Sequence, residues 1–391
     1  MTTMHPPLRK AADEYTGPPK QRFFGEEWFE RDLEAIWRPR WLIAGHVDEL
    51  DANGKYGYLT YSIGDDELLI RRAPDGTLRA FYNVCPHRGA RLCDGPSGKS
   101  TKRIVCPYHL WSFSPSDGAL TTSREMHDDF DREAYGLTSA HVDVWHGLIF
   151  ICLADEPPAP LHEYLADVTL GAYDLSGMKL AAFKSHTIEA NWKLVIENNL
   201  ECYHCVVNHP ELTAVVDWRY FATDDFDEHC SMRADGLEAA SFPARFTNPL
   251  AGSPLCAVPA PRTDGSAEYD PLHSQQGIFE PGVGLALQAD HGWFFVPRPL
   301  GPERTELRQY WFVARDAVEG VDYDVDNLTN LFDSTMKQDT PLVESLQQGM
   351  RQRSYRPGPF NRVHQAFNAG FYRWYEANIE ARFPEIVARG E

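Results

Sequence analysis

The sequence has no run of apolar residues long enough to cross a lipid bilayer, which takes about 18 such residues in a row. Its first residues also lack the charged and then apolar order of a signal peptide, so we expect a cytoplasmic protein. Basic residues are scarce: 37 lysines and arginines stand against 57 acidic residues, a formal net charge of -20. Because this charge repels phosphate groups, the composition argues against nucleic acid and anionic membranes as partners.

Cysteine is also scarce for a chain of this length. Eight cysteines in 391 residues do not make the disulfide framework of a small secreted protein. In a reducing compartment, cysteine and histidine at short paired spacings indicate metal binding instead. The length and the 43% hydrophobic content suit two domains, each able to bury a substantial core.

Turns, prolines and apolar residues divide the chain into three segments. Residues 1–44 contain an amphipathic helical pattern at 26–37, and we expect this segment to pack on the last domain. Residues 45–155 carry short alternating runs separated by Asn-Gly and Asp-Gly turns, which indicates a compact antiparallel β domain. An acidic, proline-rich stretch at 155–160 marks the boundary to the last domain, residues 156–391.

The last domain mixes strand and helix patterns. Asn191 is a suitable N-cap for a helix that runs into the 200s. The other patterns are strands at 185–190, 293–296 and 307–313 and helices at 325–350 and 363–383. The expected fold class is therefore α+β, with an antiparallel β domain followed by a domain in which helices cover an antiparallel sheet.

The first candidate metal site combines Cys85-Pro-His87 with Cys106-Pro-Tyr-His109. Two thiolates and two imidazoles can hold a tetrahedral zinc ion, or a [2Fe–2S] cluster in which cysteines bind one iron and histidines the other. Zinc sites usually pair cysteine with cysteine at short spacing. One cysteine and one histidine in each loop favour the cluster, and structural zinc is the alternative.

The second candidate site contains two histidines five residues apart, His204 and His209. On an ideal helix this interval separates them by about 140°. Pro210 disfavours helical geometry at His209, which can then fold back toward His204. Two unrelated surface histidines are the simplest alternative, and a zinc site formed with Cys202 and Cys205 is another.

A mononuclear ferrous centre with two histidines needs a carboxylate from elsewhere in the chain. Asp339 lies in phase with an apolar face of the 325–350 helix. The apolar residues on that face are Phe332, Leu342, Val343 and Leu346. A carboxylate that faces a core is costly unless it is paired or binds a metal, and this makes Asp339 the candidate third ligand.

These motifs resemble those of the Rieske non-haem iron oxygenases, in the alpha or terminal oxygenase subunit. The first domain matches their paired loops through Cys85-Pro-His-Arg-Gly89 and Cys106-Pro-Tyr-His109. The last domain matches through Asn191-Trp-Lys, Glu201-x-x-His204-x4-His209 and Gln338-Asp339. The resemblance implies a Rieske domain at 45–155 and a catalytic domain with mononuclear iron at 156–391.

The resemblance also implies a role for each candidate residue. The ligands of the [2Fe–2S] cluster would be Cys85, His87, Cys106 and His109. The ligands of Fe(II), where O2 is activated, would be His204, His209 and Asp339. Glu201 would bridge a cluster histidine of a neighbouring subunit to His204, so the resemblance implies an oligomer, a homotrimer in this family.

Two motifs of electron-delivering proteins are missing. The sequence has neither a C-x4-C-x2-C ferredoxin run nor a G-x-G-x-x-G dinucleotide loop after a strand. The resemblance implies that electrons from NAD(P)H arrive through a separate flavin- or ferredoxin-type reductase, and the absence of both motifs agrees with this.

The resemblance narrows the substrate to a small molecule. Most aromatic-ring dioxygenases of the family have Asp where this chain has Glu201, and Glu is familiar from the branch that acts on quaternary ammonium compounds. The segments Val318–Val325 and Arg356–Phe360 also resemble betaine-demethylating oxygenases. We expect N-demethylation of a betaine-like substrate, with hydroxylation of an aromatic acid or amine as the alternative. The non-oxygenase alternatives are a pure electron carrier and a zinc-stapled interaction protein.

Overall fold

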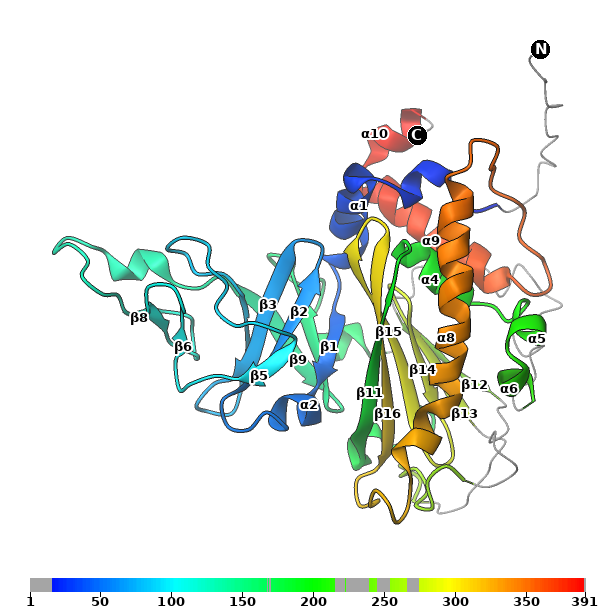
Figure 1. Cartoon of the computed structure of the whole chain (residues 1–391), viewed down its shortest axis with the longest axis horizontal. Helices are drawn as coiled ribbons and strands as arrows, with labels where there is room; N and C mark the ends of the chain where they lie inside the picture. The colour runs from blue at the N-terminus through cyan, green and yellow to red at the C-terminus, as the bar shows by residue number, and fades with distance from the viewer. Residues whose placement is uncertain are drawn as a thin grey trace.

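The computed structural model of the chain describes residues 16–166, 168, 170–214, 222, 239–244, 254–265 and 274–389. Within these residues the chain forms an antiparallel β region followed by a second antiparallel sheet that helices cover on one face (Figure 1). This arrangement is the α+β fold that the sequence predicts. Among the described residues, no helix combines the length and the hydropathy needed to cross a bilayer.

The first region is a seven-stranded sheet in the order β1-β10-β9-β4-β3-β2-β5, with a small three-stranded sheet β6-β7-β8 at one end (Figure 1). The strands of the large sheet are β1 (Leu42–His46), β2 (Gly57–Ile63), β3 (Asp66–Arg72), β4 (Leu78–Tyr82), β5 (Ser97–Lys99), β9 (Ser139–Trp145) and β10 (Leu148–Cys152). Those of the small sheet are β6 (Ile104–Val105), β7 (Ser112–Phe113) and β8 (Leu120–Thr122). The helices of this region are α2 (Val47–Asp51) and the 3-10 turn η3 (Arg132–Tyr135).

The predicted tight turns of this region are confirmed. Gly54, Gly76 and Gly118 follow Asn53, Asp75 and Asp117, and their φ angles are 79°, 87° and 76°. This left-handed conformation strains a residue with a Cβ atom, and glycine adopts it at little cost.

The second region is built on a six-stranded sheet in the order β11-β16-β15-β14-β13-β12. Its strands are β11 (Met178–Ile188), β12 (Ala239–Ala244), β13 (Ser274–Phe279), β14 (Val283–Leu287), β15 (Gly292–Gly301) and β16 (Arg304–Ala314). Its helices are α3 (Leu161–Tyr164), η4 (Leu175–Gly177), α4 (Trp192–Asn199), α5 (Cys205–Asn208), α6 (Pro210–Thr213), α8 (Val325–Met350), α9 (Ala366–Arg382) and α10 (Pro384–Arg389). The predicted strands and the two long helices are thus confirmed.

The long helix α8 runs along one face of this sheet (Figure 1). Asp324 caps its start, since its side chain accepts a hydrogen bond from Asn327 N at 2.9 Å. The prediction that Leu346 belongs to the buried face is wrong, because this side chain is 50% exposed. Near the end of the helix, the side chains of Val343 and Gln347 are buried. The Gln347 side chain accepts a hydrogen bond from Asn191 N.

The helix α4 begins where the sequence predicts and ends earlier. Asn191 Oδ1 accepts a hydrogen bond from Lys193 N at 3.0 Å, which confirms the N-cap. The prediction that the helix continues into the 200s is wrong, since α4 ends at Asn199. The Glu201 side chain accepts a hydrogen bond from Tyr203 N, and this local bond replaces the helical one.

The N-terminal segment packs on α4 and α9. It contains the 3-10 turn η1 (Lys20–Phe23), α1 (Glu26–Asp32) and the π-helical turn η2 (Leu33–Trp37). Trp37 meets Trp192 edge to face, with ring centroids 5.1 Å apart. A continuous hydrophobic core joins this segment to both sheets. The packing therefore marks no domain boundary at residue 155. The division into domains stays a prediction.

A fully buried ion pair anchors α4 to the N-terminal segment. Lys193 Nζ binds Asp32 Oδ2, and both side chains are 0% exposed. Trp192 Nε1 donates to the same carboxylate at 2.9 Å, and the Tyr375 hydroxyl donates to its other oxygen at 2.7 Å. The Asn-Trp-Lys motif therefore fixes the helix that leads into the second candidate site.

We predict that Lys193→Met lowers the free energy of unfolding by about 3–5 kcal/mol, because it leaves the Asp32 charge buried without its partner. Urea unfolding followed by tryptophan fluorescence measures this loss, and Lys102→Met, at an exposed lysine, is the control. Adding Asp32→Asn to Lys193→Met should restore part of the loss. A loss in Lys193→Met no larger than in the control would contradict the role of the pair.

Two candidate metal centres

The first centre lies in two loops at the three-stranded sheet, and the two loops have the same backbone geometry. In each loop the cysteine N–H donates to a carbonyl five residues later, and the cysteine carbonyl accepts from the N–H four residues later. The bonds are Cys85 N to Ala90 O, Gly89 N to Cys85 O, Cys106 N to Trp111 O and Leu110 N to Cys106 O, at 2.8–3.1 Å. Each cysteine is 1% exposed, so the loops present two sulfurs inward.

Each loop needs a residue with a left-handed backbone conformation four positions after its cysteine. Gly89 meets this need with φ 75°, and Leu110 occupies the equivalent place with φ 60°. A leucine in this conformation is strained, and the surrounding hydrogen bonds hold it there.

The two histidines of these loops lie side by side. The rings of His87 and His109 have centroids 4.8 Å apart, and His87 stacks on Trp111 at 4.5 Å. Nδ1 of His109 is buried and makes no hydrogen bond, as expected for an atom that faces a metal. A pair of neighbouring thiols and a pair of neighbouring imidazoles fit a cluster with different ligands on its two irons.

Burial raises the pKa of the Cys85 thiol to about 11, although the backbone N–H groups of His87 and Arg88 donate to its sulfur and lower the pKa. A buried thiolate therefore needs positive charge beside it, and an iron cluster supplies this charge.

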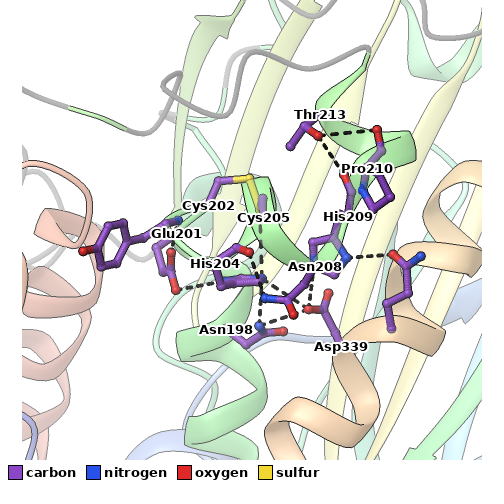
Figure 2. Close-up of a disulfide and its surroundings, with 12 residues drawn as sticks. Asn198, Glu201, Cys202, His204, Cys205, Asn208, His209, Pro210, Thr213 and Asp339 are labelled. Carbon is purple, nitrogen blue, oxygen red and sulfur yellow. Dashed lines mark hydrogen bonds and ion pairs between the residues drawn. A yellow bond between two sulfur atoms is a disulfide. The ribbon is translucent and has the colours of Figure 1, made fainter.

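The second centre brings together two segments that lie far apart in the sequence (Figure 2). Asp339 Oδ1 on α8 lies 3.2 Å from His204 Nε2 and 2.9 Å from His209 Nε2. His209 separates α5 from α6 with φ -128° and ψ 70°, which confirms that Pro210 takes it out of the helix. His209 is 0% exposed and Asp339 5%, so the predicted triad meets inside the protein.

A partner orients each imidazole. Glu201 Oε1 lies 2.9 Å from His204 Nδ1, and Gln338 Oε1 lies 2.8 Å from His209 Nδ1. Because the Gln338 and Glu201 oxygens accept hydrogen bonds, Nδ1 carries the proton in each ring and Nε2 is left to bind a metal.

The sequence did not identify two residues of this site. Asn198 Nδ2 lies 3.1 Å from His204 Nε2 and 3.2 Å from Asp339 Oδ1, and no periodic signal marks it because α4 ends before His204. Gln338 belongs to the recognised Gln-Asp motif, but the motif alone does not show that it holds His209.

The electrostatics of the second centre favour a cation. Burial disfavours the charged form of His204, yet its hydrogen bonds to Asp339 and Glu201 outweigh burial and raise its pKa to about 9. Burial likewise opposes ionisation of Asp339, and hydrogen bonds to both histidines nevertheless lower its pKa. Two carboxylates thus draw positive charge into the site, and a divalent metal replaces the protons.

The alternative zinc site, with Cys202 and Cys205 among its ligands, cannot form while these two cysteines are oxidised. Cys202 and Cys205 form a disulfide, and a disulfide sulfur has no thiolate to offer a metal. The remaining ligands, two histidines and one carboxylate, form the triad typical of non-haem iron.

Comparison with known proteins identifies the family of both regions of the chain. A model of the Rieske [2Fe-2S] domain matches residues 40–137, and a model of the ring hydroxylating alpha subunit (catalytic domain) matches residues 175–381. The glycine betaine monooxygenase oxygenase subunit of Pseudomonas aeruginosa (strain UCBPP-PA14) is 35% identical over 397 residues, which cover 95% of this chain and 91% of that protein. The chain belongs to the Rieske oxygenase family.

Other similarities extend over part or all of this Rieske oxygenase. The carnitine monooxygenase oxygenase subunit of Escherichia coli (strain K12) is 35% identical over 198 residues, 49% of this chain and 52% of that protein. The crystal structure of the quaternary ammonium Rieske monooxygenase CntA with an inhibitor superimposes with a TM-score of 0.71 at 23% identity, covering 94% and 96% of the two chains. Naphthalene 1,2-dioxygenase from Rhodococcus sp. gives 0.70 at 19% identity, covering 94% and 95%.

These findings confirm the predicted family, fold class and enzyme class. A Rieske oxygenase contains a [2Fe–2S] cluster and a non-haem iron, and it uses O2 with electrons from a separate reductase. Membership of this family overturns the zinc-stapled interaction protein and the pure electron carrier.

A cavity of about 150 Å³ adjoins the triad of this Rieske oxygenase. Its aromatic wall consists of Trp293, Phe295, Phe332 and Phe367. Trp293 stacks on Phe332 with centroids 4.1 Å apart. Tyr203 is not part of this wall; it stacks on His364 and is 52% exposed.

We predict that Gln338→Leu weakens Fe(II) binding by roughly 10–100-fold, because it removes the acceptor that orients His209. Titration of the iron-depleted protein with Fe(II) under argon measures the affinity. Gln348→Leu, at an exposed position of the same helix, is the matched control and should bind Fe(II) normally. Unchanged affinity in Gln338→Leu would show that His209 needs no such partner.

Proposed function

We propose that the chain is the terminal oxygenase of a Rieske system that N-demethylates a small quaternary ammonium compound of the betaine type. In this proposal the cluster is held by Cys85, His87, Cys106 and His109, and the mononuclear iron by His204, His209 and Asp339. The observation that carries the substrate class is the aromatic cavity beside the triad.

The cavity suits a cation that cannot donate hydrogen bonds. Aromatic faces attract quaternary ammonium groups, and such groups need no polar partner. Among the described residues that line the cavity, none is a lysine or an arginine, and the two acids are Glu201 and Asp339. The relatives named for glycine betaine and carnitine support the same class of substrate.

The iron, when bound, activates O2 for hydroxylation of the substrate. The chain places the substrate cation among aromatic rings, with an N-methyl group toward the triad. A hydroxylated N-methyl group is a carbinolamine, which loses formaldehyde and leaves the demethylated amine.

O2 uptake and formaldehyde release across a panel of substrates test this proposal. With a compatible reductase, we expect glycine betaine or a related betaine to give formaldehyde in proportion to the O2 consumed. Aromatic acids and amines of similar size form the comparison group. A hydroxylated aromatic product without formaldehyde would favour the alternative function and contradict the betaine proposal.

We further infer that electrons pass between subunits through Glu201. In one chain the cluster loops at β6–β8 and the triad near α5 lie at opposite ends of the molecule (Figure 1). The Glu201 side chain is held against His204 and is 10% exposed. Exposed apolar side chains surround both ends, Val84, Tyr108 and Leu110 at the cluster and Tyr203, Val206 and Val207 near the triad.

These two apolar ends support a head-to-tail contact between subunits. Such a contact buries two different patches, and repeating it closes a ring when the rotation permits. We propose a homotrimer of this kind, in which the cluster of one subunit faces Glu201 of the next.

We predict that Glu201→Gln retains cluster and mononuclear iron but lowers substrate-coupled turnover by roughly 10–100-fold, because the bridge loses its charge. Stopped-flow absorption should show slower reoxidation of the reduced cluster by O2 and substrate, while reduction by the reductase keeps its normal rate. Glu133→Gln, at an exposed glutamate, is the control. Normal coupled turnover in Glu201→Gln would rule out the bridging role.

A further inference from the structure

The Cys202–Cys205 disulfide lies directly beside the proposed iron ligands (Figure 2). His204 stands between the two cysteines in the sequence, and both cysteines are 3% exposed and line the cavity. Nothing in the oxygenase reaction described above uses these two sulfurs.

Cys205 points its sulfur at the metal centre. Its Sγ lies 4.0 Å from His204 Nε2, and one ligand atom each from His204, Cys205 and His209 lie within 4.8 Å of one another. In a tetrahedral zinc site with bonds of about 2.3 Å to sulfur and 2.0–2.1 Å to nitrogen, neighbouring sulfur and nitrogen ligands are about 3.6 Å apart. A small shift of the Cys205 side chain would therefore bring its sulfur into the coordination shell.

We propose that the disulfide withholds Cys205 from the metal, and that its reduction converts the centre into a zinc-selective site. This inference rests on the proposed function, since it takes His204, His209 and Asp339 as the metal ligands. In the disulfide form three ligands leave coordination positions open for chemistry. In the dithiol form Cys205 adds a fourth, and four ligands make a closed tetrahedral site of the structural type.

The change of ligand also changes the preferred metal. Ferrous iron is well served by imidazole and carboxylate, whereas a soft sulfur ligand favours zinc. The disulfide thus protects the iron site against capture by zinc for as long as Cys202 and Cys205 stay oxidised.

The reduction is a two-electron step in which a small dithiol is the electron donor. A small dithiol such as dithiothreitol attacks the S–S bond, which breaks, and its own two sulfurs become the new disulfide. The two electrons and two protons pass to Cys202 and Cys205, which become thiols. Both cysteines line the cavity, so a small dithiol that enters the cavity approaches the disulfide.

The test compares metal preference and zinc ligation in the two redox forms. Protein with an intact cluster but without mononuclear iron is prepared as the disulfide, or reduced with dithiothreitol that is then removed under argon. Competition between Fe(II) and Zn(II) gives the affinity ratio, and X-ray absorption at the zinc edge shows whether sulfur binds zinc. The iron cluster does not contribute at that edge.

We expect reduction to raise the preference for zinc over Fe(II) by at least about tenfold and to introduce a zinc–sulfur bond near 2.3 Å. Two matched variants separate the ligand from the loss of the disulfide. Cys202→Ser should show the zinc–sulfur bond without any reductant, since it frees Cys205. Cys205→Ser, which also lacks the disulfide, should show no such bond in either condition.

Two outcomes distinguish this inference from the proposed function. If the disulfide form binds Fe(II) and no sulfur appears beside zinc in reduced protein or in Cys202→Ser, the inference is wrong and the oxygenase proposal stands. If the disulfide form binds no Fe(II) at the triad, both are overturned.

Discussion

The buried carboxylate of Asp339 is the constraint that organises the catalytic half of the molecule. It contacts two histidines from another part of the chain, at 3.2 and 2.9 Å, inside a largely apolar wall. A charge in such surroundings is stable only with a positive partner, and here the positive charge comes from protonated imidazoles or from a metal. The position of α8 against α4, α5 and α6 is therefore fixed by chemistry as well as by packing.

Several local features position the two histidines that contact Asp339. The early end of α4 at Asn199 lets the chain turn, and the Glu201 side chain supports the turn by binding Tyr203 N. The buried pair of Asp32 and Lys193 holds the start of α4 in place. The positions of His204 and His209 thus depend on side chains at the start of α4, which explains why the motif begins as early as Asn191.

Much of the fold and of the site could be predicted from the sequence. The cluster loops are local, so spacing alone pairs Cys85 with His87 and Cys106 with His109. Asp339 could be found because a single carboxylate on an apolar helical face is unusual. Pro210 likewise revealed the break at His209, since its effect on the preceding residue is local.

The features that escaped prediction depend on tertiary contacts. The exposure of Leu346 depends on which neighbours cover α8, and helical phase does not contain this information. Asn198 joins the site only because α4 stops before His204. The disulfide depends on the distance between Cys202 and Cys205 in the folded turn, and their spacing suits a metal site as well as a disulfide.

The central claim is that one chain carries a [2Fe–2S] cluster and a separate mononuclear iron held by His204, His209 and Asp339. Metal and acid-labile sulfide analysis of the anaerobically purified protein and of Asp339→Ala tests it most directly. The account predicts iron and sulfide in the wild type, and in Asp339→Ala the loss of the mononuclear iron with cluster sulfide unchanged. Zinc without acid-labile sulfide in the wild type, or equal mononuclear iron in both proteins, would contradict it.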